Sequence, residues 1–264
     1  MIESAVHPGA SGLETRRMLP LRDHLPSRTF PVVNNALIAL NVLAFGLEAW
    51  LMAGNGDALA AGGGTTALDQ WVLVPARLVA HPLASAPTLF THMFLHANLG
   101  HVAGNMLFLW IFGDNVEDAL GHARYVLFYL ACGLFAALAQ VAVSPHAAVP
   151  MLGASGAISG VLAAYGLLYP RSPITVINPI PLMWLFWGLF VSFPAWLVIL
   201  EFFAANLWNA FQPTNAAGGV AFVAHVGGFV AGLVLLPLLR KQEPVDYDPW
   251  ERWLAPRGAR ELSS

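Results

Sequence analysis

The sequence predicts an all-α membrane protein in which six transmembrane helices form one bundle and both termini lie in the cytoplasm. Three observations carry this prediction: an apolar composition, six apolar stretches, and a one-sided distribution of basic residues. Of the 264 residues, 57% are hydrophobic and 10% are charged, and the mean hydropathy is +0.63. A soluble domain carries about 25% charged residues, so this composition does not suit a surface that faces water.

The same composition excludes several other classes of protein. Intrinsic disorder needs low hydrophobicity and high net charge, whereas the formal net charge here is -3. The single cysteine, Cys132, has no partner within the chain for a disulfide. The twelve basic residues form no stripe along an apparent face, so no nucleic-acid partner is expected.

Six apolar stretches are assigned to the helices, because a helix needs about 20 mostly apolar residues to cross the hydrocarbon core. In chain order they are residues 32–53, 96–117, 124–143, 152–169, 182–205 and 218–240. They define a membrane domain over residues 32–240, between a cytoplasmic N-terminal segment, 1–31, and a cytoplasmic C-terminal tail, 241–264. The connection 170–181 contains four prolines and is expected to be short and stiff.

The basic residues set the orientation of these helices. With six spans, both termini and the loops near 118–123 and 170–181 share one side, which holds eleven of the twelve Lys and Arg residues. Only Arg77 falls on the opposite side. Because cytoplasmic flanks are enriched in basic residues, both termini are predicted to be cytoplasmic. The second, fourth and sixth helices then run from the outer face to the inner face.

Polar residues stand inside these three descending helices, where each is a functional candidate because it is costly in lipid. The second helix carries His101 and Asn105, which lie four residues apart and so on one helix face. The fourth begins with Gly153-Ala154-Ser155-Gly156, and the sixth carries His225 followed by Gly228. All fall in the first half of their helix, so they are expected at a similar depth below the outer surface.

Each of these residues also has a simpler structural interpretation. Gly156 with Gly160, and Gly228 with Gly232, form GxxxG pairs, which usually indicate close helix packing. An intramembrane histidine or asparagine can simply hydrogen-bond a neighbouring helix. The structural interpretation leaves unexplained why two histidines, an asparagine and a Gly-x-Ser-Gly motif gather at one level.

Cofactor chemistry has less support in the sequence. His92 and His96 are spaced as metal ligands on a helix can be, but no cysteine or carboxylate stands at ligand spacing near them. A haem held between His101 and His225 would give Ser155 no role. No metal and no cofactor are therefore expected. A Ser-His-Asp triad has no obvious acid, so a Ser-His pair remains.

Together these motifs resemble the rhomboid family of intramembrane serine proteases. The resemblance covers the second to sixth helices through His101-x-x-x-Asn105, Gly153-Ala154-Ser155-Gly156 and Ala224-His225-x-x-Gly228. Thr91-His92, His96, Gly113 and Glu117 also match family segments around the second helix. Where some members have a tyrosine one turn after the nucleophile, this chain has Ser159.

The resemblance implies a role for each matching residue. Ser155 would be the nucleophile, and His225 its general base and then general acid. His101 and Asn105 would donate hydrogen bonds to the developing oxyanion, together with the backbone N–H of Ser155. Gly153, Gly156 and Gly228 would be structural residues near the site, where small residues let the helices approach closely.

The resemblance also implies the partners: the substrate would be a transmembrane segment of another protein, cut near its outer end within the lipid bilayer. The apolar fifth stretch is a candidate lateral gate for that segment. The alternative is a proteolytically inactive relative that binds transmembrane segments. No organellar targeting stretch is apparent, so a multi-pass position in a bacterial-type plasma (inner) membrane is expected.

Overall fold

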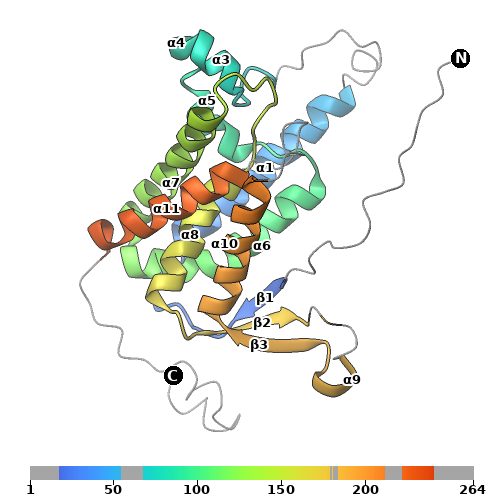
Figure 1. Cartoon of the computed structure of the whole chain (residues 1–264), viewed down its shortest axis with the longest axis vertical. Coiled ribbons are helices and arrows are strands. Elements are labelled where there is room, and N and C mark those ends of the chain that lie inside the picture. The colour runs from blue at the N-terminus through green and yellow to red at the C-terminus, as the bar shows by residue number, and fades with distance from the viewer. Residues whose placement is uncertain (1–17, 55–67, 179, 181–183, 212–221, 241–264) are drawn as a thin grey trace, which may run out of the picture.

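The computed structural model describes residues 18–54, 68–178, 180, 184–211 and 222–240. Within these ranges the protein is mostly helical: the long helices pack into one bundle, with a small sheet at one end and the short helices α3 and α4 at the other (Figure 1). Much of the predicted N-terminal segment, the whole predicted tail and the first residues of the predicted sixth helix lie outside the described residues.

Six helices in the described part of the chain have 14 or more residues: α1 Val32–Gly54, α6 Leu99–Leu120, α7 His122–Val143, α8 Ser155–Leu168, α10 Ala195–Ala210 and α11 Phe222–Leu239. Between α1 and α6 lie the short helices α3 Pro75–Ala80, α4 Pro82–Ser85 and α5 Thr88–Thr91 and the 3-10 turn η1 His92–Phe94. Five of the six long helices match a predicted stretch to within about four residues at each end. The fifth stretch differs.

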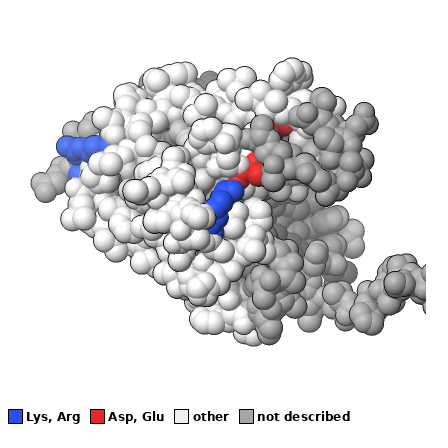
Figure 2. Space-filling model, turned by 90° about the horizontal axis from the view of Figure 1, so that it is seen from above, with Lys and Arg blue, Asp and Glu red and all other residues white. Residues whose placement is uncertain are grey.

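Three of the described helices are long and apolar enough to cross a bilayer: Val32–Ala53, His122–Val143 and Phe222–Leu239. Helices α8 and α10 are apolar but shorter. The 14 residues of α8 rise about 21 Å, which is less than the roughly 30 Å of a hydrocarbon core. The end of the molecule seen from above in Figure 2 carries few charged side chains among its described residues.

A three-stranded antiparallel sheet shows that the all-α prediction was wrong for one part of the chain. The strands are β1 Pro20–Asp23, β2 Pro173–Ile177 and β3 Phe190–Pro194, in the order β1-β2-β3. β2 lies in the predicted stiff connection 170–181, and β3 lies in the predicted fifth helix, 182–205. In that stretch the structure has the single turn α9 Trp184–Trp187, then β3, and a long helix only from Ala195.

The fifth stretch was misassigned because its composition is that of a membrane span. Residues 172–200 contain no Asp, Glu, Lys or Arg, and an apolar run without a period does not distinguish a strand from a buried helix. Gly188 has φ +80°, a conformation that favours glycine and ends the turn of α9. β3 then pairs with β2 along its length, and the hydroxyls of Thr175 and Ser192 lie 2.9 Å apart across the pair. These residues therefore form a strand that pairs with β2, although their apolar composition is typical of a transmembrane helix.

Glu117 near the end of α6 anchors the start of α1. Its carboxylate accepts hydrogen bonds from the backbone N–H groups of Val33 (3.0 Å) and Asn34 (2.7 Å) and also contacts His122 Nδ1. A carboxylate at a helix N-terminus satisfies N–H groups that have no partner within the helix. The contact places the first turn of α1 beside the last turn of α6.

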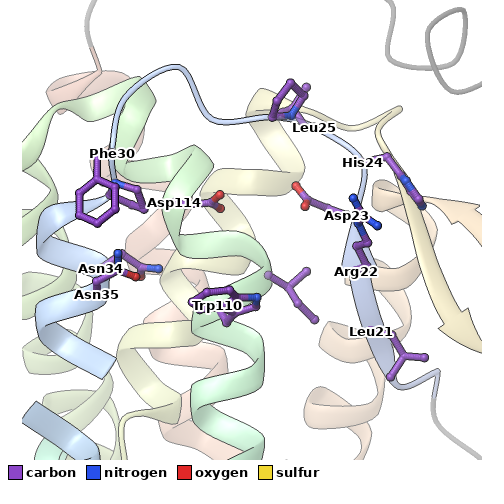
Figure 3. Close-up of a pocket in the computed structure, with 13 residues that line it drawn as sticks. Leu21, Arg22, Asp23, His24, Leu25, Phe30, Asn34, Asn35, Trp110 and Asp114 are labelled. Carbon is purple, nitrogen blue, oxygen red and sulfur yellow. The ribbon is translucent and has the colours of Figure 1, made fainter. Parts of the chain in front are cut away.

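A cavity of about 570 Å³ lies between β1, α1 and α6 at the sheet end of the bundle (Figure 3). The carboxylates of Asp23 on β1 and Asp114 on α6 point toward one another across it. Asp23 Oδ2 accepts hydrogen bonds from Asn115 Nδ2 (2.9 Å) and the Tyr165 hydroxyl (3.0 Å). Asp23 thereby connects the first strand to both α6 and α8.

The carboxyl group of Asp23 is expected to make the stability of the folded protein depend on pH. Burial first, and then the negative charge of Asp114, raise the pKa of Asp23 from 3.8 to about 7. The folded state therefore binds a proton that the unfolded chain has already lost, so its contribution to stability is complete below about pH 4 and is lost as the pH rises through about 7. Thermal unfolding of detergent-solubilised protein should show a midpoint that falls over this window. Asp23→Asn should flatten that fall, and an unchanged slope in the variant would contradict it.

Candidate active site

Helices α6 and α8 begin at the end of the bundle that lies away from the sheet. β2 follows the C-terminal end of α8 almost directly, and β1 contacts the C-terminal part of α6 through Asn115. The N-terminal residues of both helices therefore lie at the far end. There they meet the start of α11, which packs along α7 and α8 (Figure 1).

Ser155 and His225 meet at this end. Ser155 is the first residue of α8 and His225 the fourth of α11. His225 Nε2 lies 2.7 Å from Ser155 Oγ, which is hydrogen-bond distance. His225 is 8% exposed, so its ring is largely shielded from solvent. A serine hydroxyl beside an imidazole is the arrangement from which a nucleophile is generated.

Glycines allow this contact because they bring the two helix backbones together. A Cβ on Gly228 would lie 2.0 Å from the carbonyl oxygen of Gly156, and a Cβ on Gly232 would lie 2.4 Å from that of Gly160. Neither position can hold a side chain without moving one backbone. The GxxxG pairs thus pack α8 against α11, and the same packing places Ser155 beside His225.

His101 and Asn105 converge on Gly153, two residues before Ser155. A Cβ on Gly153, whose φ is +114°, would lie 2.7 Å from His101 Nε2 and 3.6 Å from Asn105 Nδ2. Asn105 Nδ2 is buried and has no hydrogen-bond partner among the residues that the structure describes. A buried donor without a partner costs about 1–3 kcal/mol, so this amide is available to a group that enters the site.

Asn206 on α10 contacts the other side of the imidazole. Its Oδ1 lies 2.5 Å from His225 Nδ1. Asn206 was not among the predicted site residues, because a carboxylate was the expected third partner and because the fifth predicted helix ended at residue 205. A signal was present: an asparagine within an apolar helix is costly in lipid and needs a partner.

Ser159 lies one turn after Ser155, and its hydroxyl donates to the backbone oxygen of Ser155 at 2.8 Å. It is fully buried. Its hydrogen bond thus stays within α8 and does not reach His225. The aromatic rings near His225 come from α11 itself and from α10: Phe222 on α11 meets the imidazole edge to face at 6.1 Å, and Phe202 on α10 lies 6.4 Å away.

Glu48 on α1 makes a contact that serves the fold. Glu48 Oε2 accepts the backbone N–H of His96 at 3.2 Å, which connects α1 to the segment before α6. Across the described ranges, no group of three His, Cys, Asp or Glu residues could hold a metal ion. Both ring nitrogens of His225 already contact protein atoms, so a haem iron would have to displace Ser155 or Asn206.

A comparison with protein families identifies the class of protein. The model of the family described as "Rhomboid domain" matches residues 84–242, more than half of the chain. The matched region contains α6, α7, α8, α10 and α11. The chain belongs to the rhomboid family of membrane proteins.

Three relatives illustrate the range of similar proteins. "Rhomboid protein 1, mitochondrial" of Saccharomyces cerevisiae is 26% identical over 208 residues, 75% of this chain and 51% of that protein. "Rhomboid protease GluP" of Bacillus subtilis is 44% identical over 81 residues, 31% of this chain and 15% of that protein. "Rhomboid-like protein 11, chloroplastic" of Arabidopsis thaliana is 31% identical over 161 residues, 57% of this chain and 51% of that protein. The matches thus cover about half of these relatives' length or less.

Proposed function

We propose that this protein is an intramembrane serine endopeptidase that cuts a transmembrane segment of another protein near its outer end. The observation that carries the proposal is the 2.7 Å contact between Ser155 Oγ and His225 Nε2. Family membership supports it, and the Bacillus subtilis relative is named a rhomboid protease. The roles of individual residues are part of the proposal.

Catalysis begins when Ser155 Oγ attacks the carbonyl carbon of the scissile peptide bond and His225 Nε2 takes the hydroxyl proton. The resulting oxyanion collapses, the C–N bond breaks, and His225 returns the proton to the departing amine. The acyl group is then an ester on Ser155. In the second half of the reaction, His225 takes a proton from a water molecule and the resulting hydroxide attacks the ester. The ester bond to Ser155 Oγ then breaks, and His225 returns the proton to Ser155 Oγ.

We assign stabilisation of the oxyanion to His101 Nε2 and Asn105 Nδ2, which both lie close to Gly153, and to the backbone N–H of Ser155. The buried Asn105 Nδ2, which has no hydrogen-bond partner among the described residues, supports this assignment, because a preorganised donor costs no reorganisation during the reaction. Gly153 keeps the approach open, since any side chain there would meet His101.

Replacing Asn105 by alanine should therefore lower kcat about 10²–10³-fold, because one oxyanion donor is lost. His101→Ala should lower kcat to a similar extent. Steady-state cleavage of a transmembrane substrate in liposomes separates kcat from KM. A rise in KM with kcat unchanged would assign these side chains to substrate binding instead.

The position of the site suits hydrolysis in a membrane. The short α8 has Ser155 at its N-terminus, so Ser155 lies below the outer surface if the inner end of α8 reaches the inner surface. We place all six long helices across the bilayer, with residues 32–240 as the membrane domain and both termini cytoplasmic. Water would then reach Ser155 from the outer side.

The test is cleavage of a transmembrane substrate with small residues near its outer end, by the wild type and by Ser155→Ala in parallel liposomes. The proposal predicts one cut near the outer end by the wild type and none by the variant. Cleavage that survives in Ser155→Ala would contradict it. If the folded wild type binds the transmembrane segment without cutting it, the protein is instead a proteolytically inactive member of the family.

The membrane that holds the protein is a separate part of the proposal. A bacterial-type plasma membrane agrees with the similarity to the Bacillus subtilis relative. The names of the yeast and Arabidopsis relatives place those proteins in mitochondria and chloroplasts. Membrane fractionation of the source cells tests this part, and recovery of the protein in an organelle would overturn it.

A further inference from the structure

We infer that Asn206 is a positioning residue that holds the imidazole of His225 in the tautomer that serine activation requires. The inference rests on the proposed serine protease function and adds a third residue to its Ser-His pair. Asn206 contacts the imidazole, and we assign it no contact with the substrate. It lies on α10, whereas Ser155 and His225 lie on α8 and α11.

The orientation of the Asn206 amide is set within its own helix. Asn206 Nδ2 donates to the backbone oxygen of Phe202, one turn earlier, at 2.7 Å. The amide oxygen is therefore the atom that faces His225, and it lies 2.5 Å from Nδ1. The reversed amide would point a donor at the imidazole and leave its oxygen against the Phe202 oxygen, where two acceptors would repel each other.

This orientation selects one form of the neutral imidazole. An amide oxygen only accepts hydrogen bonds, so His225 Nδ1 must carry the proton. Nε2 then has a free lone pair, and Nε2 is the nitrogen that faces Ser155 Oγ at 2.7 Å. The partner of Nδ1 thus decides whether Nε2 can accept the serine proton. In many hydrolases a carboxylate is the partner of Nδ1.

The surroundings make the contact effective. Asn206 is 1% exposed, so water does not compete for its oxygen in the described structure. Phe202 and Phe222 lie near the imidazole ring, with ring centroids 6.4 Å and 6.1 Å from its own. When His225 becomes positively charged during catalysis, both of its N–H groups need acceptors, and Asn206 Oδ1 supplies the one at Nδ1.

Because Asn206 comes from α10, the inference connects the dyad to the packing of that helix. α10 contacts α11 and, less extensively, α8. A displacement of α10 by more than about 1 Å would take the 2.5 Å contact beyond hydrogen-bond distance. A substrate that enters past α10 would then be cut only after the helix has returned to its place.

The first test measures the rate of Ser155 labelling by a fluorophosphonate as a function of pH. Asn206→Leu, which keeps the volume but removes the acceptor, should label about 10²-fold more slowly. Asn206→Asp should keep much of the rate and move the acidic midpoint of the profile upward by about one pH unit, because a negative charge beside the ring favours its protonated form. A purely structural role would lower both rates without moving the midpoint.

A matched control is available on the same helix. Asn209 makes the same backbone contact as Asn206, with its Nδ2 2.7 Å from the oxygen of Ala205, and stands three residues further along α10. Asn209→Leu and Asn209→Asp should leave the midpoint of the profile unchanged. The other ionisable groups on helices around α11 are identical in all variants; they include His101 on α6, Cys132 on α7 and Glu201 on α10.

A second measurement does not depend on activity. The nitrogen-15 NMR shifts of His225, assigned by their disappearance in His225→Gln, should show a protonated Nδ1 in the wild type and a mixture of tautomers in Asn206→Leu. A protonated Nε2 in the wild type would overturn the inference, and so would wild-type labelling and an unchanged midpoint in Asn206→Leu. A wild type with the expected tautomer but no labelling would instead contradict the protease function.

Discussion

Replacing His225 by alanine should lower fluorophosphonate labelling of Ser155 by about 10³-fold or more. The histidine is the only group within 2.7 Å of Ser155 Oγ that the described structure offers as a base, and an unactivated serine is a poor nucleophile. Residual catalysis would come from the oxyanion donors, which His225→Ala leaves in place. Labelling rates at saturating probe, with folding checked by thermal unfolding, measure the effect.

His81→Ala is the matched control for this variant. His81 is an exposed histidine in the short-helix segment between α1 and α6. Its replacement should leave the labelling rate within about twofold of the wild type. A His225 variant that labels as fast as the His81 variant would show that another group activates the serine.

Replacing Gly228 by alanine should both destabilise the protein and remove most of its activity. The added Cβ would lie 2.0 Å from the Gly156 carbonyl oxygen, and the atoms in conflict are backbone atoms that cannot rotate away. Relief requires α11 to move from α8, which lengthens the Ser155–His225 contact. We expect a loss of stability of about 1–3 kcal/mol and at least a 10²-fold loss of labelling.

Gly104→Ala provides the comparison, because a Cβ on Gly104 would meet no atom within 4 Å. Both variants add one methyl group to a glycine inside a long helix, and only one creates a conflict. Gly104→Ala should unfold at the wild-type temperature or slightly higher, since alanine favours helix more than glycine does. Equal losses in the two variants would contradict the close packing of α8 and α11.

Five of the six long helices were predictable because each has a strong apolar pattern bounded by polar residues or turns. The sheet was not, since β1 lies in a polar segment and β2 and β3 lie in uncharged sequence that resembles a span. Strand pairing depends on contacts between residues 20–23 and residues 174–176, about 150 positions apart in the chain. Local composition does not predict a pairing between segments so far apart in the chain.

The candidate site was predictable in part for a similar reason. Helix direction and spacing placed His101, Asn105, Ser155 and His225 at one level, and family resemblance supplied their roles. What the spacing did not contain is which side chains face each other. Asn206 illustrates the gap: its contact with His225 depends on the packing of α10 against α11, which the sequence does not reveal.

The most direct test of the account is labelling of the purified wild type and Ser155→Ala by a fluorophosphonate in liposomes, followed by mass spectrometry of the modified peptide. The account predicts one adduct, on Ser155, that His225→Ala slows and Ser155→Ala abolishes. An adduct on another residue, or no adduct on a folded wild type, would contradict the claim that Ser155 is an activated nucleophile.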